Sequence, residues 1–230
     1  MQKNILLAVL LLSACSSPTV KSPFKANKVV SSSETEAKSV ADEFLISADG
    51  IGKAKLGMTV GELKEILDGD TKFEVVSPLM VDVNAIAVSK DGLVQYYVLY
   101  PAGTTSHSDK STPTDNDPIS LLMTDNYNYQ TNEGVGAGTL IKEAEDIYGN
   151  AVLSYNLEGE SREYITFSDK NLDNINFRAA YFQSTSDGLG LSGIYPKYPG
   201  VAYTTDKYRE DAAIAAVEVF CTPELCSYGF

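Results

Sequence analysis

The first half of the chain alternates apolar and polar residues in a pattern that predicts a short helix followed by strands. Thr59 and Glu62 have the spacing of a capping box, and Gly69 supplies a helix stop. Between them, apolar residues recur at helical intervals, at positions 60, 63, 66 and 67. Strands are predicted for four apolar runs, at residues 44–46, 73–76, 81–88 and 93–100. Asp91-Gly92, between the last two runs, predicts a tight hairpin turn.

The second half repeats this order. An apolar stripe at positions 140, 144, 147 and 148 predicts a second helix, which Thr139 precedes and Gly149 ends. Strands are predicted for residues 119–123, 151–155, 163–167 and 175–182, with a closing strand at 214–220. Thr59 and Thr139 take equivalent places, which suggests duplication of a small unit. We therefore expect an α+β fold of two tandem β-α-β-β-β units, each a short helix packed on a mostly antiparallel sheet. The first unit and a linker would occupy residues 41–112, and the second unit with the closing strand 113–230.

The N-terminal residues resemble the signal of a bacterial lipoprotein. Lys3 precedes an apolar run at residues 5–12, which is shorter than the roughly 20 residues that a membrane-spanning helix needs. The run ends in Leu12-Ser13-Ala14-Cys15, which resembles a lipobox. The resemblance implies removal of residues 1–14 as a signal peptide and acylation of Cys15, for example with palmitate, so that lipid chains hold the protein on a membrane.

The residues after Cys15 bear on where the protein is held. Ser16, where an Asp would imply retention in the inner membrane, implies the outer membrane and its periplasmic face. Residues 15–40 are rich in Ser, Lys and Pro and have few apolar side chains, which predicts a flexible tether.

Composition narrows the class of function. The formal net charge is −13, from 31 acidic and 18 basic residues, which argues against nucleic acid as a partner because phosphate binding needs clustered Lys and Arg. One His and three Cys leave little material for a His-based triad or a zinc site. We therefore expect no catalytic residue, no metal and no cofactor.

A second resemblance lies in the first predicted helix. Gly57-Met58-Thr59, followed by Glu62-Leu63 and Ile66-Leu67, resembles the start of the helix-on-sheet unit of the SmpA/OmlA lipoprotein family. The same unit in tandem resembles the β-lactamase-inhibitor-protein fold and uncharacterised envelope lipoproteins. The second copy departs from the motif, because Gly138 replaces the Met and Lys142 takes the Glu position. The resemblance implies a non-enzymatic envelope protein that binds another protein, either as an assembly accessory or as an inhibitor.

The two C-terminal cysteines, Cys221 and Cys226, predict a disulfide that closes a short loop, because an envelope compartment is oxidising. A redox-active pair is the alternative, although the Cys-x-x-Cys spacing is missing.

Asp169, Asn171 and Asp173 match the opening of a calcium-binding loop. The twelfth position of that loop is Ala180 rather than a bidentate Glu. The pattern therefore favours a polar hairpin turn, and calcium binding stays the open alternative.

Fourteen Tyr residues occur without any Trp, and several lie in predicted loops. Tyr127, Tyr129, Tyr195 and Tyr198 are candidates for a partner-binding surface, because loop tyrosines supply contact area at low entropic cost. The alternative is that they anchor long loops to the core.

These patterns together predict a lipid-anchored protein that binds a protein partner and catalyses nothing. The acidic surface favours a basic partner. A small-ligand carrier or an enzyme acting on cell wall or lipid is the alternative, supported by Glu158, Glu160 and Glu163 near Tyr155 and Tyr164. A purely structural spacer is a third possibility.

Overall fold

The computed structural model describes residues 40–80, 82–101, 113–169, 172–180, 190–197, 199–223 and 226. All of them belong to one compact unit that spans residues 38–230. The predicted signal peptide, the lipobox with Cys15 and nearly all of the predicted tether lie outside the described residues. The boundary expected between residues 112 and 113 borders a stretch that is also outside them.

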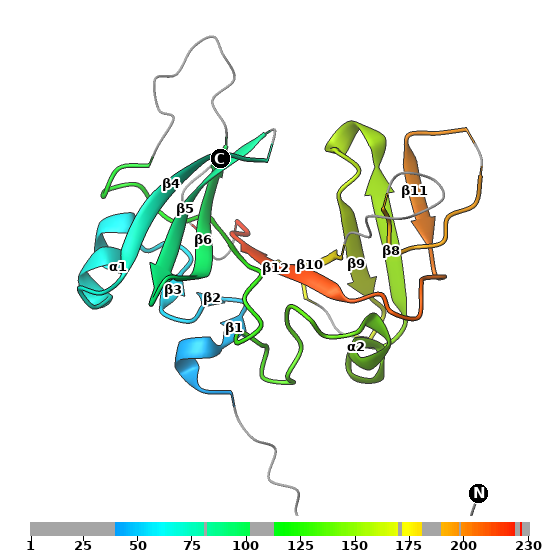
Figure 1. Cartoon of the computed structure of the whole chain (residues 1–230), viewed down its shortest axis with the longest axis horizontal. Helices are drawn as coiled ribbons and strands as arrows, with labels where there is room; N and C mark the ends of the chain where they lie inside the picture. The colour runs from blue at the N-terminus through cyan, green and yellow to red at the C-terminus, as the bar shows by residue number, and fades with distance from the viewer. Residues whose placement is uncertain are drawn as a thin grey trace, which may run out of the picture. The chain divides into compact units, whose positions relative to one another are not determined.

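A nine-stranded antiparallel sheet forms the larger layer of the fold (Figure 1). Its strands run in the spatial order β11-β8-β9-β10-β12-β7-β6-β5-β4. Their bounds are β4 Lys72–Met80, β5 Val83–Lys90, β6 Leu93–Pro101, β7 Leu121–Thr124, β8 Ala151–Asn156, β9 Glu163–Phe167, β10 Ile175–Ala179, β11 Ala202–Thr205 and β12 Ile214–Phe220. The C-terminal strand β12 pairs with both β7 and β10, so it joins the two halves of the chain within one sheet.

The hairpin between β5 and β6 forms as the sequence predicts. Asp91 and Gly92 have φ angles of 53° and 78°, which is the backbone that a two-residue turn between twisted strands requires. The Lys90↔Leu93 pair closes the turn. Local turn chemistry therefore sets the register of the β5–β6 pair next to the turn.

A second layer covers one face of the large sheet and consists mostly of extended chain. It begins with the 3₁₀-helix η1 (Asp42–Phe44), followed by the three-stranded sheet β1 (Ile46–Ser47), β2 (Gly50–Ile51) and β3 (Ala54–Lys55). Strand β2 lies against β7 and β12. Two short helices complete the layer, α1 (Val60–Ile66) and α2 (Ile141–Tyr148), while η2 (Leu157–Gly159) follows β8.

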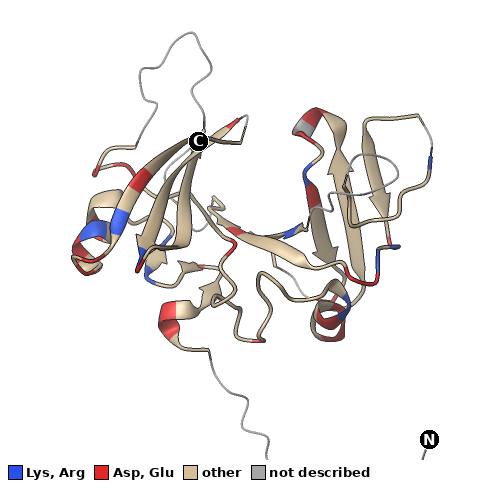
Figure 2. Ribbon diagram, viewed as in Figure 1, with Lys and Arg blue, Asp and Glu red and all other residues tan. Residues whose placement is uncertain are grey.

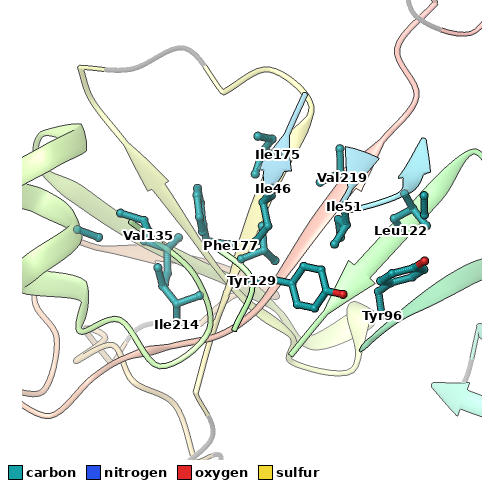
Figure 3. Close-up of a cluster of buried hydrophobic side chains, with 14 of the residues drawn as sticks. Ile46, Ile51, Tyr96, Leu122, Tyr129, Val135, Ile175, Phe177, Ile214 and Val219 are labelled. Carbon is teal, nitrogen blue, oxygen red and sulfur yellow. The ribbon is translucent and has the colours of Figure 1, made fainter. Parts of the chain in front are cut away.

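The main hydrophobic core lies between these layers. Figure 3 shows Ile46 and Ile51 from the small sheet close to Leu122 and Val219 of the large one. All four side chains are buried. Burial of each large aliphatic side chain stabilises the fold by about 1.5–3 kcal/mol, which explains why such short strands stay packed on the large sheet.

Helix α1 begins where the sequence predicts. The Thr59 hydroxyl accepts a hydrogen bond from the Glu62 backbone N–H at 3.1 Å, and the Glu62 carboxylate accepts one from the Thr59 N–H at 2.7 Å. Helix α2 begins one residue after its expected equivalent. The Thr139 hydroxyl instead accepts a hydrogen bond from Gly136 N–H at 3.0 Å, within the preceding loop. The two helix starts are therefore not equivalent.

The expected α+β fold of two tandem β-α-β-β-β units is wrong. Of the described residues, 45% are in strands and 13% in helices, and only two α-helices occur among them. These helices have seven and eight residues, too few to cover the faces of the sheet. Extended segments cover the rest of the face that holds the main core. One continuous sheet replaces the two expected units. None of the helices in the described part is long and apolar enough to cross a membrane.

Candidate functional site

A cavity of about 310 Å³ opens at the end of the main core, between the β5–β6 hairpin and the N-terminal segment of the described chain. Buried Val88, Tyr96 and Tyr129 form its floor, while the rim consists of exposed polar and charged residues. Cavities that bind small ligands begin at about 300 Å³ and combine an apolar lining with a few polar groups. This cavity therefore has the size and character of a small-ligand site.

Three aromatic rings from separate parts of the chain meet at this cavity. Phe44 ends η1, Tyr96 lies on β6, and Tyr129 lies in the loop after β7. The Phe44 and Tyr129 ring centroids are 5.5 Å apart at 74°, and those of Tyr96 and Tyr129 are 6.0 Å apart at 87°. Figure 3 shows Tyr129 and Tyr96 next to each other at one end of the core cluster. Edge-to-face packing of this kind fixes all three rings.

Hydrogen bonds to two neighbouring segments hold Tyr129 in place. Asn126 donates from its side-chain amide to the Val94 carbonyl at 2.8 Å and accepts from the Asn128 N–H at 3.0 Å. Gln130 N–H donates to the Phe44 carbonyl at 3.0 Å. These bonds tie the Tyr129 loop to β6 and to η1, so the aromatic floor is preorganised.

Gly52 lets the chain approach Tyr129 closely. Its φ is +54°, and an added Cβ would lie 2.6 Å from the Glu43 carbonyl oxygen and 3.1 Å from Tyr129 Cε1. Only glycine adopts this backbone freely and leaves that space empty. The turn between β2 and β3 therefore depends on Gly52 to place Lys53 and Glu43 at the rim.

The hydroxyl of Tyr96 is unusual because it is buried without a hydrogen-bond partner in the described structure. The Tyr96 side chain is only 3% exposed, and burial raises its pKa, with a smaller contribution from Tyr129. Tyr129, which is 4% exposed, donates its hydroxyl to Gln95 Oε1 at 3.3 Å. An unpaired buried hydroxyl costs about 1–3 kcal/mol, so its retention calls for an explanation.

Charged groups of both signs form the rim. The Lys90 ammonium contacts the Asp68 carboxylate at 2.6 Å, and this hydrogen bond lowers the pKa of Asp68 and raises that of Lys90. Glu43, Asp91 and Lys53 also line the cavity. Burial raises the pKa of Tyr129 to about 12, and the negative charge of Glu43 adds to the effect. The carboxylate of Glu43 therefore acts electrostatically on the aromatic floor.

The tyrosines proposed from sequence as a partner surface take different positions. Tyr127 is 72% exposed, whereas Tyr129 is buried in the cavity floor. Tyr195 is half-buried and packs edge-to-face on Tyr155, with centroids 4.6 Å apart. Tyr198 lies outside the described residues. Neither Tyr127 nor Tyr195 lines the cavity with Tyr129, and a surface role stays a prediction for Tyr127.

The acidic residues considered for catalysis do not converge on one site. Glu163 is buried, and its carboxylate accepts hydrogen bonds from Ser192 N–H and Gly193 N–H, each at 2.7 Å, and from the Tyr195 hydroxyl at 2.8 Å. Glu160 faces Arg162 at 3.3 Å, and Glu158 is exposed. Glu163 therefore anchors the loop that contains residues 192–195.

The two C-terminal cysteines are bonded to each other. Cys221 and Cys226 form a disulfide with Cα atoms 5.6 Å apart.

The residues that match a calcium-binding loop are only partly described. Asn171 is outside the described residues, and the Asp169 carboxylate accepts a hydrogen bond from the neighbouring Ser168 hydroxyl at 2.7 Å. Among described residues, no group of three or more His, Cys, Asp or Glu is arranged to hold a metal ion.

Sequence reasoning missed the cavity because its lining is scattered over five segments of the chain. Nothing local in the sequence distinguishes a core tyrosine whose hydroxyl has a hydrogen-bond partner from one whose hydroxyl has none. The alternation along β6 was the available signal, since Tyr96, Val98 and Tyr100 share one face of the sheet.

Comparison of the chain with protein-family models, with curated proteins and with solved structures finds no match. The geometry and chemistry of the site itself are therefore the basis for inferring the function.

Proposed function

We propose that the folded part of this chain is a non-enzymatic binding module that holds a small organic ligand in the cavity lined by Phe44, Tyr96 and Tyr129. The observation that carries the proposal is a cavity of about 310 Å³ with a buried floor of Val88, Tyr96 and Tyr129 and a polar, charged rim. A ligand with one polar group could place its apolar body against Phe44 and the floor and its polar group at the rim. The small-ligand alternative raised by the sequence is therefore the favoured one.

The test is an NMR titration of the ¹⁵N-labelled protein with two neutral probes, benzyl alcohol and 3,3-dimethylbutan-1-ol. We expect shift changes at backbone amides of cavity residues, and a Phe44→Ala variant should bind either alcohol roughly 5–30-fold more weakly because apolar contact area is lost. Phe220→Ala is the matched control, because Phe220 is also half-buried but does not line the cavity. Its affinity for both alcohols should equal that of the unmodified protein.

The proposal fails if neither alcohol changes the amide shifts of cavity residues at millimolar concentrations. It also fails if shift changes occur but the Phe44→Ala and Phe220→Ala variants bind equally well, because the Phe44 ring would then have no part in binding.

We also propose that Cys15 carries the lipid that holds this module at the outer membrane. The support is the lipobox-like Leu12-Ser13-Ala14-Cys15 after an apolar run. Cells expressing the chain should incorporate labelled palmitate into it, and Cys15→Ala should abolish both labelling and sedimentation with membranes. Unlabelled protein in the soluble fraction of cells with intact Cys15 would refute this part.

A protein partner, which the sequence favoured, is the second candidate, and the exposed Tyr127 favours it. The Tyr127 ring lies on the backbone of Gly138, where an added Cβ would come within 2.4 Å of Cδ1, so the ring is held outward in one orientation. A photo-crosslinking amino acid at position 127 in intact cells should capture one discrete protein that is not captured from position 166, which is also exposed. Identical capture patterns at both positions would count against a partner at Tyr127.

A further inference from the structure

The aromatic rings and the rim charges of the cavity together indicate a chemical class of ligand. Ring faces carry negative electrostatic potential and attract a cation within about 6 Å of the ring centroid. Phe44, Tyr96 and Tyr129 all line the cavity, and Phe44, which is half-buried, offers a more accessible ring than Tyr96 and Tyr129, which are 3% and 4% exposed.

The charges at the rim favour a cation over an anion. Glu43, Asp68 and Asp91 supply three carboxylates, and Lys53 and Lys90 supply two ammonium groups. Lys90 is already paired with Asp68 at 2.6 Å. Of the remaining rim charges, Glu43 and Asp91 are negative and Lys53 is positive, so negative charge is in excess. The chain as a whole carries −13, which raises the local concentration of cations and lowers that of anions. Figure 2 shows acidic residues on η1, the element that contributes Glu43 to the cavity lining.

The cavity size narrows the class of ligand further. A space of about 310 Å³ suits a small molecule rather than a peptide segment or a bare metal ion. A compact organic ammonium ion fits this space and carries the charge that the rim favours.

We propose that the cavity binds a small organic ammonium ion, with its cationic head against the Phe44 ring and its charge balanced by Glu43. The inference rests on the proposed function, because it assigns a ligand class to the same cavity.

The test compares three probes of matched shape and different charge: choline, its neutral analogue 3,3-dimethylbutan-1-ol, and the anion 3,3-dimethylbutanoate. We expect choline to bind about 5–30-fold more tightly than the neutral alcohol, the range that one or two cation–π contacts supply, and the anion to bind most weakly. The advantage of choline should shrink as salt concentration rises, because rim charges are screened.

Two rim substitutions sharpen the test. Glu43→Gln should lower the affinity for choline several-fold, whereas Lys53→Gln should raise it. Neither substitution should change the affinity for the neutral alcohol. Glu210→Gln, an equal charge change at an exposed position that does not line the cavity, is the control and should alter neither.

The outcomes separate the two proposals. If the neutral alcohol or the anion binds as tightly as choline, the cation assignment is overturned while the ligand-binding function stands. If Glu43→Gln and Glu210→Gln have the same effect on choline, the assignment of Glu43 is overturned. Absence of binding by all three probes would overturn the proposed function and the inference together.

Discussion

Asp82 and Arg162 are 80 residues apart in sequence, yet Asp82 Oδ1 and Arg162 Nη2 are 2.7 Å apart. Asp82 lies in the turn between β4 and β5, and Arg162 directly precedes β9. The contact connects the β4–β5 turn, at one end of the large sheet, with the start of β9, on the other side of β12 in the strand order. The hydrogen bond from Arg162 lowers the pKa of Asp82.

Removing this contact should cost little and should do so in a pH-dependent way. Asp82 is 60% exposed, so we expect Asp82→Asn to lower the free energy of unfolding at pH 7 by about 0.2–1 kcal/mol. Because the pKa of Asp82 is lower in the folded chain than in the unfolded chain, the stabilisation is complete at neutral pH. It is lost as pH falls below about 4 and through the lowered pKa.

Urea unfolding of the Asp82→Asn variant at pH 7 and pH 3 checks this prediction. Asp49→Asn, at another exposed loop carboxylate, is the control. A deficit of the Asp82→Asn variant that is the same at both pH values would contradict the ionic origin of the effect.

Arg178 and Glu218 form a more deeply buried pair on the same face. Their closest N and O atoms are 3.6 Å apart, Glu218 is 6% exposed, and burial raises its pKa despite the attraction of Arg178. Arg178 also contacts the sulfur atoms of Met80, at 3.2 Å, and Met123, at 3.8 Å.

Breaking this pair on one side should be worse than replacing it entirely. We expect Glu218→Leu to cost about 2 kcal/mol of unfolding free energy, because it leaves the Arg178 charge uncompensated. Glu218→Leu combined with Arg178→Met should have a free energy of unfolding within about 1 kcal/mol of that of the unmodified protein, because this buried site can accommodate two apolar side chains. Guanidinium unfolding of both variants measures the difference. A double variant less stable than the single one would show that the ion pair itself is favourable.

Gly52 should be far less tolerant of substitution than Gly57, although both have positive φ. An added Cβ at Gly52 meets the Glu43 carbonyl oxygen, whereas nothing lies within 4 Å of the same atom at Gly57. We expect Gly52→Ala to cost roughly 2–4 kcal/mol and Gly57→Ala about 1–2 kcal/mol, the latter from backbone strain alone. Thermal unfolding of the two variants would test this, and equal losses would mean that the close approach at Gly52 is relaxed easily.

Removing the buried hydroxyl of Tyr148 should lower the stability of the fold, whereas removing that of Tyr96 should not. The Tyr148 hydroxyl lies 2.6 Å from that of Thr131 and donates to Glu133 Oε2 at 3.0 Å, so Tyr148→Phe should cost about 1–2 kcal/mol. Within the described part of the chain the Tyr96 hydroxyl has no such partner, so Tyr96→Phe should leave stability unchanged or raise it by up to about 1 kcal/mol. Chemical unfolding without ligand measures both. A large loss for Tyr96→Phe would mean that its hydroxyl is satisfied in solution.

Local chemistry made several elements predictable from sequence. Asp91-Gly92 can form few turns other than a tight hairpin, and Thr59 with Glu62 satisfies the exposed N–H groups at a helix start whatever surrounds it. Gly149, at φ 80°, ends α2 as expected. The strands at 163–167 and 214–220 also match the structure residue for residue.

Which strands pair, and which side chains meet, depended on the tertiary structure. The sequence could not show that β12 inserts between β7 and β10 and turns two expected units into one sheet, because pairing partners are chosen by burial over the whole chain. Tyr127 and Tyr129 illustrate the same limit, since they are two residues apart in one loop, one exposed and one buried. A loop has no periodicity that assigns a side chain to a face, so only the packing of Phe44 and Tyr96 around Tyr129 decided where the cavity lies.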